Sequence, residues 1–229
     1  MKILFIGNSH TYFNDMPEQV ARMIAAAVGE KPEVVMLAYS GRELKWHREE
    51  YFAVRFALTY GGFDYCVIQQ AAHPYPPADE TRSGYKWVCD MCHRHGVKPV
   101  VFMTWAERDK PENQQKMIDL CEEIARENGA LLAPVGRIWE RIRRERPDID
   151  LYFEDGGHAG VYGDFLIAAV ICKTITGALP PAGYAHAVDF TCGEPLDWDD
   201  LRLSEDRERL NIELERGKVE AIVRFINND

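Results

Sequence analysis

A serine and an aspartate–histidine pair, far apart in the chain, are the residues whose types and spacing could do chemistry. Ser9 follows the apolar run 2–6 and a glycine, and it precedes a helical pattern. Asp155 and His158 stand three residues apart in a glycine-rich stretch, so the carboxylate can fold back onto the imidazole. A serine hydroxyl needs a base to take its proton, and histidine serves best when a carboxylate fixes its tautomer. Together the three residues could carry out acyl transfer.

Each part also has an ordinary structural interpretation. A serine in a strand-to-helix turn more often bonds to nearby backbone groups than attacks a substrate. Asp155 could equally be a helix cap, and His158 after it an exposed surface histidine. The elements that position these residues therefore have to be considered.

Strands and helices alternate through the first three quarters of the chain. Short apolar runs predict strands over 2–6, 33–38, 64–68, 98–104 and 130–135. Helical spacing predicts helices over 17–28, 79–95, 111–128, 137–145 and 161–175 and a mostly helical segment over 44–60. This alternation predicts a three-layer α/β/α sandwich with a central parallel sheet of about five strands. In such sheets the ligand crevice lies beyond the carboxyl ends of the strands, which places Ser9 at its mouth.

Other polar and aromatic residues also follow predicted strands. We expect His10, Gln70, His73 and Trp105 to lie along the crevice and to contact the substrate. With Trp46 and Tyr75, Trp105 could form a wall on which a sugar stacks, although aromatic side chains of this size are more often core residues.

Length and composition are those of one ordinary globular domain. The 229 residues are 46% apolar and 28% charged, with no long apolar span and no secretion signal, so we expect a cytoplasmic protein without membrane contact. The net charge of −10 and the lack of a basic tract argue against a nucleic-acid partner. We expect a single domain over 1–229. Its catalytic core would span 1–176, and 177–229 would form a connector and a helical appendage, with a helix over 201–225 and no catalytic residue.

Two rival chemistries can be read from the cysteines and histidines. Cys89, Cys92 and His93 have the spacing of haem attachment, and with His95 could bind zinc, but they fall within a predicted helix and lack a second ligand pair. We therefore expect free thiols and no metal. His186 with Asp189 is a second possible dyad, although it lies beyond the predicted sheet.

In combination, the motifs resemble those of the SGNH hydrolases, also called GDSL-type esterases. The resemblance spans 3–170 and rests on Gly7-Asn8-Ser9, Ser40-Gly41, a carboxamide after the third strand, and Asp155 with His158. It implies a flavodoxin-like fold and ester hydrolysis without a cofactor, with Ser9 as nucleophile, His158 as base and Asp155 orienting it. It also implies an oxyanion hole made by the backbone N–H groups of Ser9 and Gly41 and by the carboxamide.

The sequence departs from the family pattern at two positions. Asn8 replaces the usual Asp, and Ile68-Gln69-Gln70-Ala71 replaces the usual Gly-x-Asn-Asp block. A glutamine carries the same donors one methylene further out. Of the two, Gln69 is the first side chain after the predicted strand, so we expect it rather than Gln70 to complete the oxyanion hole, as side chains alternate along an extended chain.

The function expected from these observations is a serine esterase that removes a small acyl group, acetyl in the first instance, from a carbohydrate-like alcohol. It resembles the subset of the family with glutamine at this position, which includes acetylesterases acting on sugars. Two other classes stay open: a binding protein that kept the fold but lost catalysis, and a metal-dependent hydrolase using the histidines. The sequence does not indicate an oligomeric state.

Overall fold

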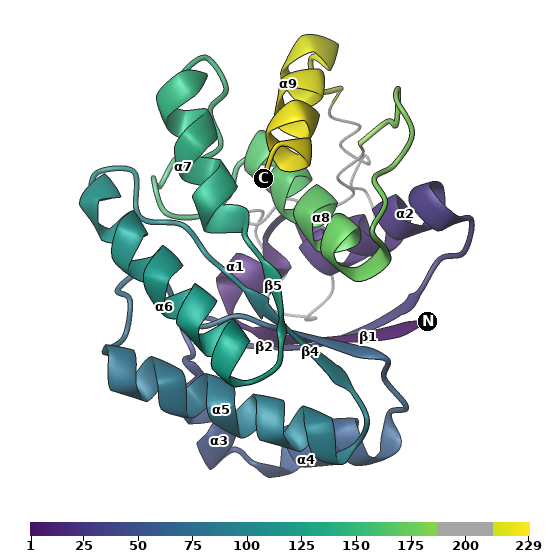
Figure 1. Ribbon diagram of the computed structural model, residues 1–229, viewed down its shortest axis with the longest axis vertical. Helices are drawn as coiled ribbons and strands as arrows, with labels where there is room; N and C mark the ends of the chain where they lie inside the picture. The colour runs from purple at the N-terminus through teal and green to yellow at the C-terminus, as the bar shows by residue number, and fades with distance from the viewer. Residues whose placement is uncertain (187–212) are drawn as a thin grey trace, which may run out of the picture.

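A parallel sheet forms the centre of the protein. In the computed structural model, which describes residues 1–186 and 213–229, five parallel strands are arranged in the order β2-β1-β3-β4-β5 (Figure 1). Their bounds are β1 (Lys2–Gly7), β2 (Glu33–Ala38), β3 (Tyr65–Ile68), β4 (Lys98–Phe102) and β5 (Leu131–Ala133). The strand order reverses between β1 and β3, and in open sheets of this kind the ligand crevice forms at that point.

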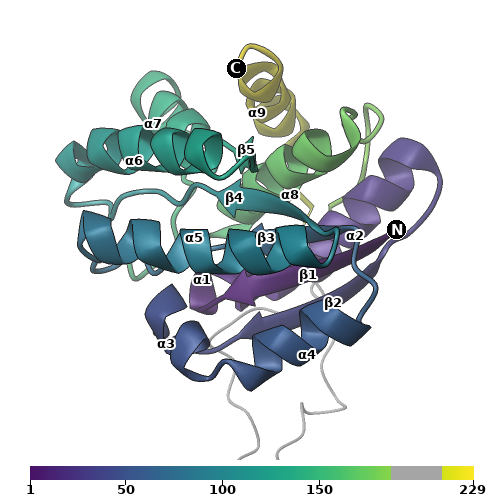
Figure 2. The ribbon, with the colours of Figure 1, turned by 60° about the horizontal axis from the view of Figure 1, so that its bottom comes forward.

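Helices cover both faces of this sheet. One face carries α2 (Met16–Val28), α7 (Val135–Glu145), α8 (Val161–Thr176) and α9 (Arg216–Asn227), and the other α3 (Leu44–Glu49), α4 (Phe52–Tyr60), α5 (Ala78–Arg94) and α6 (Gln114–Glu127) (Figures 1 and 2). The short α1 (Ser9–Tyr12) and a 3₁₀ turn (Phe13–Asp15) connect β1 to α2. The predicted α/β/α sandwich is therefore confirmed.

The alternation of side chains along β1 divides the core into two halves. Ile3 and Phe5 pack with the α2 and α8 side, whereas Leu4 and Ile6 pack with the α3 and α5 side, and all four are fully buried. A strand buried on both faces reads as a continuous apolar run, which is why the sequence could predict it. Gly7 is the last residue of this strand, so the core fixes where the next residues, Asn8 and Ser9, leave the sheet.

The segment predicted to be mostly helical over 44–60 contains two helices, α3 and α4, with a break between them. The four residues from Arg48 to Tyr51 are all exposed, so no core contact holds the helix continuous there. Of the predicted helix over 201–225, residues 201–212 lie outside the described residues, as does part of the connector.

The C-terminal helix α9 packs against the rest of the fold. Ala221, Ile222 and Ile226 are buried in the same half of the core as α8. The division into a core over 1–176 and an appendage over 177–229 stays a prediction. Among the described residues, no helix is long and apolar enough to cross a membrane.

Candidate active site

The turn after β1 presents Ser9 at the start of α1. The Asn8 side chain caps this helix, because its Oδ1 accepts a hydrogen bond from the His10 N–H at 3.1 Å and its Nδ2 donates to the Arg42 carbonyl at 3.1 Å. Gly7 must lack a side chain, since a Cβ atom would collide with the Thr11 hydroxyl and the Gln69 carboxamide. The turn is thus held from several sides before any substrate binds.

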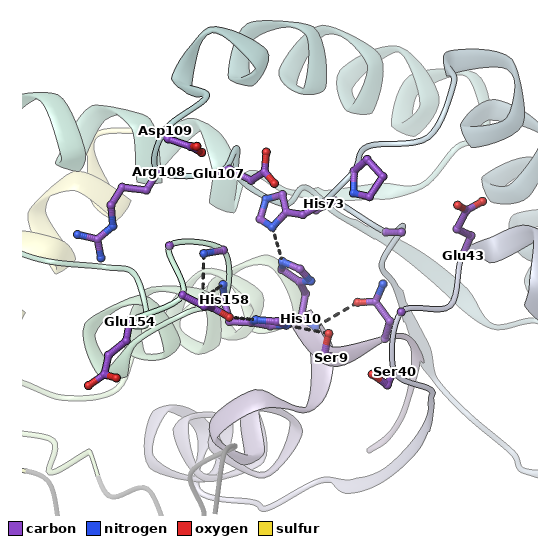
Figure 3. A pocket seen from close by; sticks show the side chains of 18 of the residues that line it. Ser9, His10, Ser40, Glu43, His73, Glu107, Arg108, Asp109, Glu154 and His158 are labelled. Carbon is purple, nitrogen blue, oxygen red and sulfur yellow. Dashed lines mark hydrogen bonds and ion pairs between the residues drawn. The ribbon is translucent and has the colours of Figure 1, made fainter.

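Ser9, His158 and Asp155 form a continuous hydrogen-bonded chain. The His158 Nε2 lies 2.8 Å from the Ser9 Oγ, and the His158 Nδ1 lies 2.5 Å from the Asp155 Oδ2 (Figure 3). Because the carboxylate can only accept, Nδ1 carries the proton in the neutral ring and Nε2 is left to accept the serine proton. This is the geometry of a nucleophile, a base and an orienting acid.

The loop that carries the dyad is folded tightly around Asp155. Its Oδ1 accepts hydrogen bonds from the backbone N–H groups of Gly157 and His158, each at 2.9 Å. Burial opposes ionisation of this carboxyl, but the bonds from the His158 ring and from the two N–H groups outweigh it and lower the pKa of Asp155. The carboxylate is therefore ionised wherever the imidazole has to act.

Ser9 and Gly41 line the same cleft, and each has a backbone N–H group. Gly41 has φ +66° in the turn closed by the hydrogen bond from the Arg42 N–H to the Tyr39 carbonyl, a conformation that favours glycine. Among the described residues, neither the Ser9 N–H nor the Gly41 N–H donates a hydrogen bond. Both are free to donate to a bound oxygen.

The cleft around Ser9 has a volume of about 1060 Å³ and is lined by loops that follow β1, β2, β3 and β4 and by the loop before α8 (Figure 3). Its rim is acidic. Arg108 is paired with Asp150 at 3.0 Å and Glu107 with Lys110 at 2.6 Å. Glu43, Asp109 and Glu154 form no ion pair with any residue that the structure describes.

Solved structures with the same fold share this architecture. A protein assigned to the SGNH hydrolases from Slackia heliotrinireducens is 26% identical, with a TM-score of 0.66 over 76% of this chain and 98% of that one. The chain has the SGNH hydrolase fold. The acetylxylan esterase Axe2 of Geobacillus stearothermophilus is 15% identical, with a TM-score of 0.63 over 76% and 94% of the two chains. A protein of Parabacteroides merdae described as a GDSL-like lipase is 16% identical, with a TM-score of 0.59 over 77% and 95%.

No protein-family model and no curated protein matches the sequence. The likeness to SGNH hydrolases therefore rests on the fold and on the solved structures. The predicted enzyme class, a hydrolase of ester bonds, is confirmed at this level, because the neighbours are SGNH hydrolases and esterases.

Three residues that the sequence predicts to lie in the site are found behind the cleft. Gln69 is 1% exposed, and its Oε1 accepts hydrogen bonds from the Asn8 N–H at 2.8 Å and the Thr11 hydroxyl at 3.0 Å, while its Nε2 donates to the Gln70 carbonyl. Gln70 is buried too, and its Oε1 accepts from the Leu44 and Ala71 N–H groups. The predicted direction of both side chains has to be corrected, because backbone N–H groups around the nucleophile turn attract them inward.

Trp105 is the third such residue. It is fully buried, stacks on Trp139 with ring centroids 4.1 Å apart, and donates its indole N–H to the Gly157 carbonyl at 2.8 Å. Trp105 supports the loop that carries His158 from the core side. The prediction that Trp105 lies along the crevice, in a wall on which a sugar stacks, therefore has to be corrected. His10 and His73, in contrast, do line the cleft (Figure 3).

The described residues that suggested rival chemistries do not line the cleft around Ser9. Cys89 and Cys92 are free and buried in the core, and no group of three His, Cys, Asp or Glu side chains in residues 1–186 and 213–229 could hold a metal ion. His186 is buried and pairs with Asp164 at 3.1 Å, whereas its predicted partner Asp189 lies outside the described residues.

Phe13 and Asn14 belong to the site although the sequence analysis did not consider them. The Phe13 ring stacks on His158, and the Asn14 Nδ2 donates to the Ala159 carbonyl at 3.0 Å. Asn14 has φ +52°, which is uncommon outside glycine but accessible to asparagine. The distance of four residues between Ser9 and Phe13 was the signal available for Phe13, since one helical turn returns the chain to the same side. No local pattern indicated Asn14.

Proposed function

We propose that the protein is a serine esterase that removes a small acyl group, acetyl in the first instance, from a hydroxyl of a carbohydrate-like molecule. The observation that carries this proposal is the hydrogen-bonded chain from Ser9 through His158 to Asp155 at the mouth of the cleft. No cofactor takes part in the proposed reaction. The fold alone would not support it, because one fold hosts many functions.

In the first half-reaction, the Ser9 Oγ attacks the ester carbonyl carbon as its proton passes to the His158 Nε2. The carbonyl oxygen takes up the displaced electron pair and accepts hydrogen bonds from the Ser9 and Gly41 N–H groups. When this intermediate collapses, the bond to the alcohol oxygen breaks and that oxygen takes the proton from Nε2. Asp155 stabilises the positive charge that His158 carries between these steps.

In the second half-reaction, a water molecule replaces the alcohol. It gives a proton to the His158 Nε2 and adds to the acyl carbon. The bond to Ser9 then breaks, and the Oγ recovers its proton from Nε2. The acid leaves and the enzyme is restored.

The charges around the cleft favour a neutral substrate. Glu43, Asp109 and Glu154 place negative charge on the rim and form no ion pair with a described residue, so an ester with a carboxylate or phosphate close to the reacting carbon is repelled. Sugar hydroxyls can instead donate hydrogen bonds to such carboxylates. That Axe2 is an acetylxylan esterase supports the same substrate class.

Labelling with a fluorophosphonate tests this proposal directly. The reagent needs an activated serine, so we expect one adduct per chain, located on Ser9 by peptide mass spectrometry. Acetylated neutral oligosaccharides should be hydrolysed, and a chelator should not change the rate. A chain that is not labelled, or is labelled elsewhere, would contradict the mechanism. Binding of the oligosaccharide without turnover would identify a binding protein.

Gln69 is proposed to brace the nucleophile turn. Because Gln69→Ala leaves the buried Asn8 N–H and the Thr11 hydroxyl without their acceptor, we expect it to lower the free energy of unfolding by about 2 kcal/mol. Denaturant titration measures this effect. Gln115→Ala, which removes an exposed carboxamide on α6, is the control. Unchanged stability with turnover reduced by about 10²–10³-fold would instead restore Gln69 as an oxyanion donor.

A further inference from the structure

The imidazole of His158 lies between two other aromatic rings. The Phe13 ring stacks on it with centroids 3.8 Å apart and an interplanar angle of 6°, and the His10 ring stacks with centroids 4.7 Å apart at 27°. Both residues are described, and no ring contact joins Phe13 to His10. Two rings that stack on a third without touching each other lie on its opposite faces. His158 is therefore sandwiched.

Both halves of this sandwich belong to the segment that carries the nucleophile. Ser9 and His10 open α1, and Phe13 begins the 3₁₀ turn that follows it. Asn14, the next residue, donates to the carbonyl of Ala159, which is the neighbour of His158. The segment 9–14 thus contacts the loop 155–159 through one hydroxyl, two ring faces and one carboxamide. The distance from Oγ to Nε2 depends on all of these contacts.

His10 is held in one tautomer by a relay of hydrogen bonds. The His73 Nε2 lies 3.0 Å from the Trp105 carbonyl, which can only accept, so His73 carries its proton there. The His73 Nδ1 is then an acceptor, and the His10 Nε2, 3.1 Å away, must donate to it (Figure 3). A neutral imidazole has one N–H, so the His10 Nδ1 carries no proton in this arrangement.

The surroundings of His10 keep the ring uncharged. Burial lowers its pKa well below the usual value, and the nearby His73 and His158 lower it further, whereas Asp155 and the Gly157 carbonyl act in the opposite sense. Burial also lowers the pKa of His73, against the effects of the Trp105 carbonyl and of Glu107. A charged ring at either position would repel the imidazolium that forms on His158 during the reaction.

We propose that His10 and Phe13 are positioning residues that hold the His158 imidazole between them, so that Nε2 stays in line with the Ser9 Oγ while it receives and returns the proton. This inference rests on the proposed role of His158 as base. The neutral His10 face tolerates the positive charge on His158, and the Phe13 face attracts it, as aromatic faces attract cations. His10, expected from the sequence to contact substrate, would act through His158 instead.

Kinetics of matched variants test the sandwich. His10→Ala removes one wall, and since a small displacement of a reacting group can cost about 10²-fold in rate, we expect a loss of that size in kcat with little change in KM. His10→Phe restores a flat ring and should recover most of the loss, although it cannot bond to His73. Phe13→Leu should also lower kcat, because a branched side chain cannot stack flat on the imidazole.

The controls separate this inference from the proposed function. His93→Ala removes a histidine remote from the cleft, on α5, and should leave kcat unchanged. Thermal melts show whether each variant folds. If His10→Ala does not fold, His10→Phe and Phe13→Leu are compared with the wild type, and a kcat lower for Phe13→Leu than for His10→Phe is the expected result. Nitrogen NMR should find the His10 Nε2 protonated and its Nδ1 bare.

Three results would overturn the sandwich: wild-type kcat in His10→Ala, no recovery in His10→Phe, or a raised KM at unchanged kcat. The last would return His10 to a substrate-binding role. Each is meaningful only in a protein whose Ser9 reacts with the fluorophosphonate. If Ser9 does not react, the proposed function itself fails, which is a separate outcome.

Discussion

Ser9→Ala is expected to lower ester hydrolysis by about 10⁶-fold, the loss seen when the nucleophile of a serine triad is removed. The variant keeps the cleft and its backbone N–H groups, but the His158 Nε2 then has no hydroxyl to deprotonate. Release of nitrophenol from 4-nitrophenyl acetate measures the loss. The melting temperature should hardly change, because the Oγ makes one hydrogen bond at a partly exposed position.

Ser83→Ala is the matched control for this substitution. Ser83 lies on α5, where its hydroxyl accepts a hydrogen bond from Arg48 at 3.1 Å, far from the cleft. It should retain full activity. Substantial hydrolysis by Ser9→Ala, with Ser83→Ala normal, would show that another group attacks the ester.

Asp155→Asn is expected to lower kcat by about 10⁴-fold while the protein stays folded. The amide can present an N–H to the His158 Nδ1, which then favours the tautomer that carries its proton on Nε2. That tautomer cannot accept the serine proton. Asp90→Asn is the control, because it also removes one carboxylate charge, from a residue paired with Lys86 on α5. A loss of kcat in Asp155→Asn alone is then due to the position of Asp155 and not to the change in net charge.

The contribution of Asp155 to the stability of the folded protein depends on pH with a definite sign. Its pKa is lowered in the folded protein, so its stabilising interactions are fully present above the pKa of the unfolded chain and are lost as pH falls through the lowered folded value. An activity loss on mild acidification would therefore not come from protonation of Asp155. If Asp155→Asn left the shape of the pH–rate profile and the rate unaltered, Asp155 would not orient the base.

The parts of the site that lie next to regular elements could be predicted from the sequence. The apolar run 2–6 ends one residue before Gly7, which fixes Ser9 at the carboxyl end of a central strand. The Asp155 and His158 contact is local, since three residues in a glycine-rich loop suffice to close it. The three layers could be predicted for the same reason, because the spacing of apolar residues within each strand and helix indicates its type.

The parts that depend on contacts distant in sequence could not be predicted. Gln69 turns inward because the Asn8 N–H, 61 residues away, needs an acceptor, and no local pattern encodes that requirement. Trp105 is buried because Trp139 and Gly157 meet it from two other segments. The sandwich around His158 likewise needs the folded sheet to bring two segments together. Residue type predicted that these side chains matter, but not which way they face.

The site joins the beginning of the chain to a late part of it. Ser9 and His158 are 149 residues apart, and all five described strands lie between residue 2 and residue 133, before the loop that carries the base. During synthesis on a ribosome, the serine would thus emerge long before its activating partner and stay an ordinary, unreactive hydroxyl. On the proposed mechanism, the chain can hydrolyse esters only after the segment that follows all five described strands has been made, so copies that end before it should lack this activity.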